Sequence, residues 1–209
     1  MMKNAIGLLS LLLLGTTVSI QAAPFANGGF DDISINNFYE NITTNSSKLS
    51  PWKITGGNID IVANSYWKAH GGLNTIDLLG DKTTFGQIEQ SFDTISGKKY
   101  TVSFKMSAHP EDERDIMKVL NVMVNNSNMN NSLKYTYDPN KNGNSFNDMK
   151  WQNYSFDFIA KSNSATLIFT GSNANGTISN FGPVIDSVTI TPNDNPEICC
   201  TCSPCNQQN

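Results

Sequence analysis

The chain has 209 residues, a formal net charge of −4 at pH 7 and only 15% charged residues. Soluble domains usually carry about a quarter, so most of the polarity here comes from Asn, Ser, Thr and Gly. Because the chain is mildly acidic and has no cluster of Lys and Arg, we expect neither nucleic acid nor an anionic membrane surface as a partner. A surface of neutral hydrogen-bonding groups instead suits a neutral polyol ligand.

The first 22 residues are predicted to be a signal peptide. Lys3 supplies a positive start, residues 6–14 form an apolar run too short to span a bilayer, and the small residues around Ala22 allow cleavage after it. No later stretch is long and apolar enough to form a transmembrane segment. We therefore expect a secreted or cell-surface protein with one folded domain, residues 23–192, and a C-terminal tail, residues 193–209.

The folded part is a series of short segments in which apolar and polar residues alternate. The clearest is residues 99–107, and this period of two is typical of a half-buried antiparallel strand. The other predicted strands are residues 51–54, 59–63, 76–78, 85–92, 116–124, 133–137, 151–158, 165–170 and 184–191. The polar stretch at residues 34–50 has little periodicity and is expected to be a loop. Since no segment has helical periodicity, the sequence predicts an all-β fold, an antiparallel β-sandwich.

The connection between the second and third predicted strands carries the main candidate binding site. Sugar rings have apolar faces ringed by hydroxyls, so exposed aromatics beside hydrogen-bonding groups favour a carbohydrate-binding surface. We predict that Tyr66 and Trp67 stack on sugar faces while Lys68, His70 and Asn74 bind hydroxyl groups. The alternative is that Trp67 closes one end of the sandwich and serves only the fold. The expected partner is a polysaccharide or cell-wall glycan.

The sequence offers no recognisable catalytic constellation. It has two histidines, His70 and His109, both in expected loops, and it lacks a G-x-S-x-G nucleophile elbow. No spacing singles out a pair of carboxylates for glycoside cleavage. We therefore predict that the protein is not an enzyme.

A structural calcium site is predicted where the two ends of the domain meet. Gly28 and Asp31 lie near the start of the domain, and Asp186 lies in the last predicted strand. First and last strands are often neighbours in sandwiches, so their carbonyl and carboxylate oxygens could converge on a hard cation. The alternative is that these acids only cap turns.

Four cysteines, Cys199, Cys200, Cys202 and Cys205, lie together in the tail. Internal disulfides, a cross-link to another chain and a thiolate metal site all remain open, although closely spaced thiols in a secreted chain favour oxidation. A disulfide-linked partner would give a rival function, that of a structural surface or matrix protein assembled through the tail.

Several motifs together resemble one family. They are N-G-G-F-D at 27–31, Y-W-x-A at 66–69, I-D-L-x-G at 76–80, G-x-I-x-Q-x-F at 86–92 and F-G-P-V-I-D-S-V at 181–188. This order resembles the secreted choice-of-anchor C family, which is similar to the plant cell-wall proteins with "domain of unknown function 642". The resemblance covers nearly the whole of the expected domain.

The resemblance implies a galactose-binding-like jelly roll, a secreted or surface location and polysaccharide binding. Related modules often hold calcium between an N-terminal N-G-x-F-E motif and the closing Asp, and here Asp31 stands where Glu is usual. Because Y-W-x-A belongs to the shared pattern, the resemblance weakens the case for Trp67 as a ligand contact and leaves a stacking role and a fold-defining role equally open. It leaves Lys68, His70 and Asn74, on the polar rim of this connection, as the residues expected to bind the ligand. Relatives often end in an anchoring segment, so attachment through the Cys tail is expected from its position.

Overall fold

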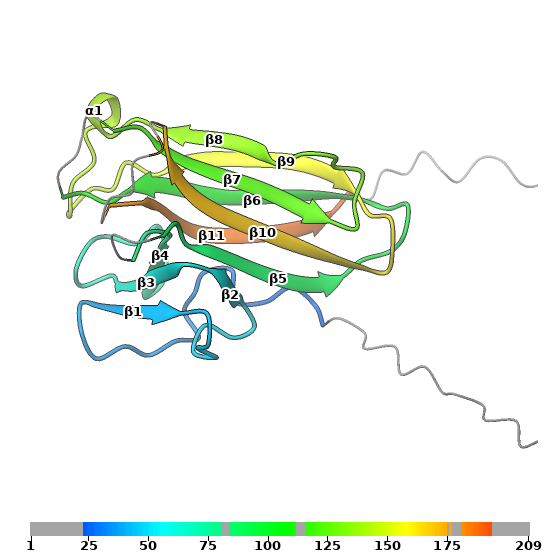
Figure 1. Ribbon diagram of the computed structural model, residues 1–209, viewed down its shortest axis with the longest axis horizontal. Helices are drawn as coiled ribbons and strands as arrows, with labels where there is room; N and C mark the ends of the chain where they lie inside the picture. Colours follow the sequence, from blue (N-terminus) through cyan, green and yellow to red (C-terminus); the bar gives the residue numbers. More distant parts are fainter. Residues whose placement is uncertain (1–22, 81–83, 112–115, 175, 177–180, 194–209) are drawn as a thin grey trace, which may run out of the picture.

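The computed structural model describes residues 23–80, 84–111, 116–174, 176 and 181–193, and within them two antiparallel sheets lie face to face (Figure 1). The predicted signal peptide and the four tail cysteines lie outside the described residues. In the described part, no helix is long and apolar enough to cross a bilayer. The predicted all-β antiparallel sandwich is confirmed.

The two sheets differ in size. The six-stranded sheet has the order β1 (Tyr39–Thr43), β3 (Asn58–Ala63), β4 (Asn74–Asp77), β11 (Pro183–Pro192), β6 (Lys99–Ala108) and β9 (Gln152–Ile159). The five-stranded sheet has the order β2 (Lys53–Gly56), β5 (Gln87–Asp93), β10 (Ser164–Asn173), β7 (Lys118–Asn125) and β8 (Leu133–Tyr137). One helical turn, α1 (Pro139–Asn142), follows β8.

The main core lies between the sheets and follows the alternation seen in the sequence. In β6 every second residue faces inward, and the five inward residues Tyr100, Val102, Phe104, Met106 and Ala108 are at most 7% exposed. The inward residues at the β3–β4 pair are fully buried, namely Ile59, Ile61, Ile76 and Leu78. Burying such side chains stabilises the fold by roughly 1.5–3 kcal/mol each.

Strand β1 corrects one sequence prediction, because it forms within the polar stretch expected to be a loop. It pairs only with β3 and is therefore an edge strand. Of its five residues only Ile42 is buried. A strand with most of its side chains in solvent does not need the period-two pattern, so the pattern could not reveal it.

The segment before β1 fastens the two sheets together. Gln90, on the inward face of β5, bonds both backbone groups of Ala26: its amide oxygen accepts from the Ala26 N–H and its amide nitrogen donates to the Ala26 carbonyl, each at 2.9 Å. The indole N–H of Trp52 donates to the Asn27 carbonyl at 2.9 Å. On the six-stranded sheet, the Gly28 carbonyl accepts from Val188 N–H at 2.8 Å. The expected meeting of the first and last segments is thus present.

Replacing Gln90 by Met should destabilise the fold by ~1–3 kcal/mol, because the two Ala26 groups would lose their partners at a site that is only 2% exposed. Urea unfolding followed by tryptophan fluorescence measures the change. Gln87→Met is the matched control: Gln87 lies in the same strand on the opposite face and bonds only the side chains of Thr55 and Thr170. Equal losses in the two variants would contradict a fastening role for Gln90.

Candidate functional site

The connection between β3 and β4, residues 64–73, is here called the covering loop, and it lies over the outer face of the six-stranded sheet. Val62 and Thr75 are paired across β3 and β4. Their neighbours Ile61 and Ile76 point into the main core, so Val62 and Thr75 point outward. Trp67 packs there with Val62, Met149 and Val184 in a second apolar cluster.

Trp67 is 1% exposed, and its indole N–H donates to Thr75 Oγ1 at 2.9 Å. The ring presents no free face to a sugar, so the structure contradicts the predicted stacking role. Trp67 serves the fold, as the alternative held, but it covers an outer sheet face and does not close an end between the sheets. The sequence pattern showed that Trp67 lies on a connection but not that this connection folds back onto a sheet.

His109 packs against the Trp67 ring. Its ring centroid lies 4.8 Å from that of Trp67 and 4.5 Å from that of Phe181, and its Nδ1 accepts from the Glu111 N–H at 3.1 Å. Burial lowers the pKa of His109 to about 3, which keeps the imidazole neutral. A neutral ring between two aromatic rings acts as packing, not as a proton carrier.

Two carboxylates hold the covering loop by its backbone. Asp186, which is fully buried, accepts from the N–H groups of His70 at 2.8 Å and Gly71 at 3.4 Å through Oδ2. Asp31 accepts from the N–H groups of Leu73 at 2.5 Å and Asn74 at 3.2 Å through Oδ1.

Gly72 and Asn74 also take part in the attachment of the covering loop. Gly72 between the two contacts has φ of +74°, and a Cβ there would lie 1.9 Å from Asp31 Oδ2, so the position requires glycine. The Asn74 side chain is 2% exposed and donates to the carbonyls of Phe30 at 3.0 Å and Ile33 at 2.8 Å. The predicted role of Asn74 as a sugar contact is therefore wrong, because its amide is engaged in the interior.

The predicted calcium ligands lie close together in space but bind N–H groups. Gly28 accepts from Val188, Asp31 from the covering loop, and Asp186 also accepts from its neighbour Ser187 at 2.5 Å through Oδ1. This set of donors accounts for the three residues without a cation. Among the described residues, no group of three or more His, Cys, Asp or Glu side chains could hold a metal ion. Calcium stays a prediction that a titration can decide.

The remaining predicted site residues lie on the surface of the covering loop. Lys68 is exposed, and its backbone bonds Phe146 and Trp151. His70 is exposed, and its Nδ1 lies 3.0 Å from Ser187 Oγ; partial burial, and then the charge of Lys105, lower its pKa. Tyr66 is half-buried and its hydroxyl donates to Glu111 at 3.3 Å; burial, and then Glu111, raise its pKa.

Beside His70 the outer face of the six-stranded sheet holds a shallow hollow of about 360 Å³, here called the polar groove. Its polar side chains come from β6, β9 and β11: Ser103, Lys105, Asn153, Ser155, Ser187 and Thr189, with Phe104 and Tyr154 completing the lining. The Lys105 ammonium donates to the Asn153 amide oxygen. Of the described residues that line the groove, Lys105 is the only charged one.

A bulge in β11 brings two of these residues to the groove. Asp186 pairs with Lys105, and Thr189 pairs with Ser103, so β11 has one residue more than β6 between these pairs. Ser187 sits at the bulge with φ of +50°. Consequently Asp186 and Ser187 both lie on the outer side of the sheet, while Val188 joins the main core. The Val188 N–H, outside the ladder, is the group that Gly28 accepts from.

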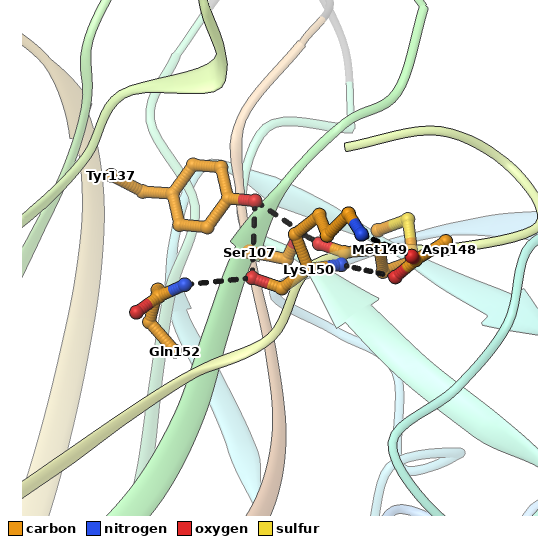
Figure 2. Close-up of polar contacts among 6 residues, drawn as sticks. All are labelled: Ser107, Tyr137, Asp148, Met149, Lys150 and Gln152. Atoms are coloured by element: carbon orange, nitrogen blue, oxygen red, sulfur yellow. Dashed lines mark hydrogen bonds and ion pairs between the residues drawn. The ribbon is translucent and has the colours of Figure 1, made fainter. Parts of the chain in front are cut away.

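The residues directly before Trp151 form a tightly held segment (Figure 2). The Tyr137 hydroxyl lies 3.1 Å from the Met149 carbonyl and 3.2 Å from the Lys150 carbonyl. Ser107 Oγ donates to the Met149 carbonyl at 2.5 Å. Lys150 has φ of +51°, a conformation that is uncommon outside glycine and that these contacts hold in place.

The fixed segment presents a half-buried indole beside His70. The Trp151 indole N–H donates to the Lys68 carbonyl at 3.1 Å, which joins this segment to the covering loop. The His70 and Trp151 ring centroids are 6.5 Å apart and the rings are nearly perpendicular. His70 therefore links this aromatic ring to Ser187 of the groove.

Ser187 and His70 are in contact, as a catalytic serine and its histidine base would be. The neighbouring groups, however, do not form the rest of a catalytic triad. A base of this kind needs a third group that orients it. Asp186, the nearest carboxylate, binds the backbone N–H of His70 and not its ring. The Ser187 N–H, which could stabilise an oxyanion, donates to Asp186 Oδ1. Among the described residues, the Ser187–His70 pair therefore has no carboxylate bonded to the His70 ring, and the Ser187 N–H is already engaged.

Comparison with known proteins places this architecture. The fold is shared with TmCBM61, solved in complex with β-1,4-galactotriose: the TM-score is 0.53, the identity is 16%, and the match covers 82% of this chain and 99% of that one. The CBM22-1 xylan-binding domain of Paenibacillus barcinonensis Xyn10C matches with a TM-score of 0.46 and 10% identity, over 73% of this chain and 92% of that domain. The protein therefore shares the β-sandwich fold of TmCBM61.

The chain belongs to the family described as "Protein of unknown function (DUF642)", whose model matches residues 23–191. Halomucin of Haloquadratum walsbyi (strain DSM 16790 / HBSQ001) is 30% identical over 105 residues, which are 48% of this chain and 1% of halomucin. The chain therefore spans only a small part of that relative. The resemblance to DUF642 proteins is confirmed, and the choice-of-anchor C assignment stays a prediction.

The sequence did not reveal the groove residues because no local pattern marks them. Lys105 and Asn153 are outward residues of alternating strands, and they meet only through the pairing of β6 with β9. Ser187 lies on the outer face of the six-stranded sheet only because of the bulge in β11. The one usable signal was Trp151, since a lone aromatic before an alternating strand lies at a strand entrance.

In EDTA, the Asp186 carboxyl should titrate near pH 6, because burial raises its pKa to about 6 from an ordinary value of 3.8. Carboxyl ¹³C NMR, assigned with Asp186→Asn, measures this pKa. A bound calcium ion would keep the carboxylate ionised and move the midpoint well below 6 when calcium replaces EDTA. An unchanged titration would contradict the calcium prediction.

Site-specific NMR is needed because two groups act in opposite directions on stability. The folded state binds the Asp186 proton more tightly than the unfolded state, so this residue adds stability as the pH falls through 6 toward 4. The lowered pKa of His109 does the reverse: its contribution is present above pH 6.5 and is lost as the pH falls toward 3.

Proposed function

We propose that this protein is a secreted carbohydrate-binding module that binds a neutral polysaccharide without catalysis. The observation that carries the proposal is the polar groove, which gathers hydroxyl and amide groups from three strands. Its residue Ser187 contacts His70, whose ring centroid lies 6.5 Å from that of the half-buried Trp151. Sugars present hydroxyl groups around an apolar ring face, so this combination matches both parts. Groups such as Ser103, Asn153 and Thr189 can each donate and accept.

The fold supports the same proposal. TmCBM61, which shares the fold, was solved with a bound β-1,4-galactotriose. A related scaffold therefore accommodates a neutral oligosaccharide. The incomplete Ser187–His70 pair supports binding without bond cleavage. Secretion follows from the predicted signal peptide, and the cell surface or an extracellular matrix would supply the glycan.

Trp151→Ala and Asn153→Ala should each weaken polysaccharide binding about tenfold, since each removes a stacking or hydrogen-bonding contact of roughly 1–1.5 kcal/mol. Affinity gel electrophoresis against a polysaccharide panel that begins with β-1,4-galactan, followed by calorimetry, measures this. Thr166→Ala is the control, because Thr166 is a similar polar residue in β10 on the other sheet, bonded to Ser91. Thermal melts verify that the variants fold.

Different outcomes separate the alternatives. Binding that both variants retain would remove the groove as the site. If no polysaccharide binds and the full-length protein forms oligomers that a reductant dissolves, the rival assembly role through Cys199, Cys200, Cys202 and Cys205 is favoured. Release of new reducing ends from any bound polysaccharide would contradict the non-catalytic proposal.

A further inference from the structure

A second feature of the same outer face is a cluster of exposed aromatic rings, here called the aromatic platform, made of Phe38, Tyr39 and Tyr66. Phe38 is 59% exposed and Tyr39 is 52% exposed. Their ring centroids lie 5.7 Å and 6.0 Å from that of Tyr66, with interplanar angles of 33° and 47°. The three rings therefore form a continuous tilted surface.

The platform is held in place from below. The Tyr66 ring contacts Trp67 at 5.5 Å and the edge of Phe146 at 5.3 Å, both of which belong to or pack on the second apolar cluster. The Tyr66 hydroxyl donates to Glu111. Next to the platform is an open hollow of about 300 Å³ whose lining includes the polar residues Asn36, Asn37 and Ser65. The rings thus have hydrogen-bonding neighbours, as the groove has.

Strand register places the platform and the groove on one row across the sheet. Tyr39 is paired with Val62, and Val62 with Thr75. At the other side, Asp186 is paired with Lys105, and Lys105 with Asn153.

The two halves of this row meet between β4 and β11. Ile76 is paired with Ile185, so the same register continues from Thr75 to Asp186. Tyr39 in β1 and Asn153 in β9 are therefore opposite ends of a single row of outward residues. With strands about 4.8 Å apart, the five spacings between β1 and β9 span roughly 24 Å.

The covering loop crosses the middle of this row. Beneath it lie the inner members of the row: Val62 and Thr75 contact Trp67, and Asp186 binds loop amides. On its exposed side are Lys68 and His70, which can donate to hydroxyl groups. Polar and aromatic contacts therefore continue from one edge of the sheet to the other.

We propose that the aromatic platform is a second contact for the same ligand, and that this ligand is an internal stretch of a long, linear, uncharged polysaccharide that runs across the strands. This inference rests on the proposed function of the groove. A protein partner fits less well, because a stable interface buries about 800 Å² per partner and the platform offers three rings edged by amides. A lipid surface fits less well, since the exposed residues beside the rings are mostly uncharged polar groups.

The proposal requires affinity to depend on chain length. An oligosaccharide that fills the groove alone gains nothing from the platform. A chain long enough to reach both the groove and the platform gains a second contact. Once the groove is occupied, the rest of the same chain meets the platform at a high effective concentration, because this step is intramolecular. The dependence on length must therefore disappear when the platform is removed, while binding of short chains stays the same.

The test measures affinities for β-1,4-galactan oligosaccharides, from the trisaccharide upward, by calorimetry with the full chain lacking only its signal peptide. Three proteins are compared with the wild type: Phe38→Ala/Tyr39→Ala in the platform, Asn153→Ala in the groove, and Ile95→Ala as the control. Ile95 is 61% exposed and lies in the β5–β6 connection, so it matches the platform residues in exposure. Phe38 and Tyr39, the two platform residues that are replaced, are more than half exposed, so the fold should tolerate their loss.

We expect the wild type and Ile95→Ala to bind long chains at least tenfold more tightly than the trisaccharide. The platform variant should bind the trisaccharide as the wild type does and lose the gain with length. Asn153→Ala should weaken both. A platform variant that keeps the full gain overturns the inference and leaves the proposed function intact. A wild type that binds neither short nor long chains of any polysaccharide in the panel overturns both.

Discussion

The outer face depends on the way two carboxylates hold the covering loop. Asp186 and Asp31 accept four backbone N–H groups from residues 70–74. Hydrogen bonds to ionised acceptors are about twice as strong as neutral ones. They offset the cost of burying the Asp186 carboxyl, a cost that shows itself as a pKa raised to about 6. These bonds and the packing of Trp67 on Val62 and Val184 together keep the loop on the sheet.

A single bulge in β11 connects this grip to the groove and to the start of the domain. The extra residue turns Ser187 outward toward the groove and His70, and it leaves the Val188 N–H for Gly28. Asp186 lies directly before it and holds the loop. The N-terminal segment, the covering loop and the groove therefore share one backbone irregularity, so a change in the bulge would disturb all three.

The sequence predicted the main core well and the outer face poorly, for a physical reason. Alternation marks which residues enter the space between two sheets, and Ile61, Ile76 and Phe104 followed it. It assigns their neighbours to solvent, yet a loop covers Val62 and Thr75. The exposed strand β1 was missed because it buries almost nothing. The pairing of Lys105 with Asn153 could not be predicted, since register across distant strands leaves no local pattern.

The covering loop divides the outer face into a structural middle and two accessible edges. Trp67 donates its indole N–H to Thr75, and Asn74 donates its side-chain amide to the carbonyls of Phe30 and Ile33. Substitution of Trp67 or Asn74 would therefore affect folding first. At the platform edge, Phe38 and Tyr39 are more than half exposed, so they add little to the packing of the fold. This separation explains why, of the aromatic pair Tyr66 and Trp67, only Tyr66 kept a partly exposed ring. It also means that side chains can change at either edge without loss of the loop that lies between the two edges.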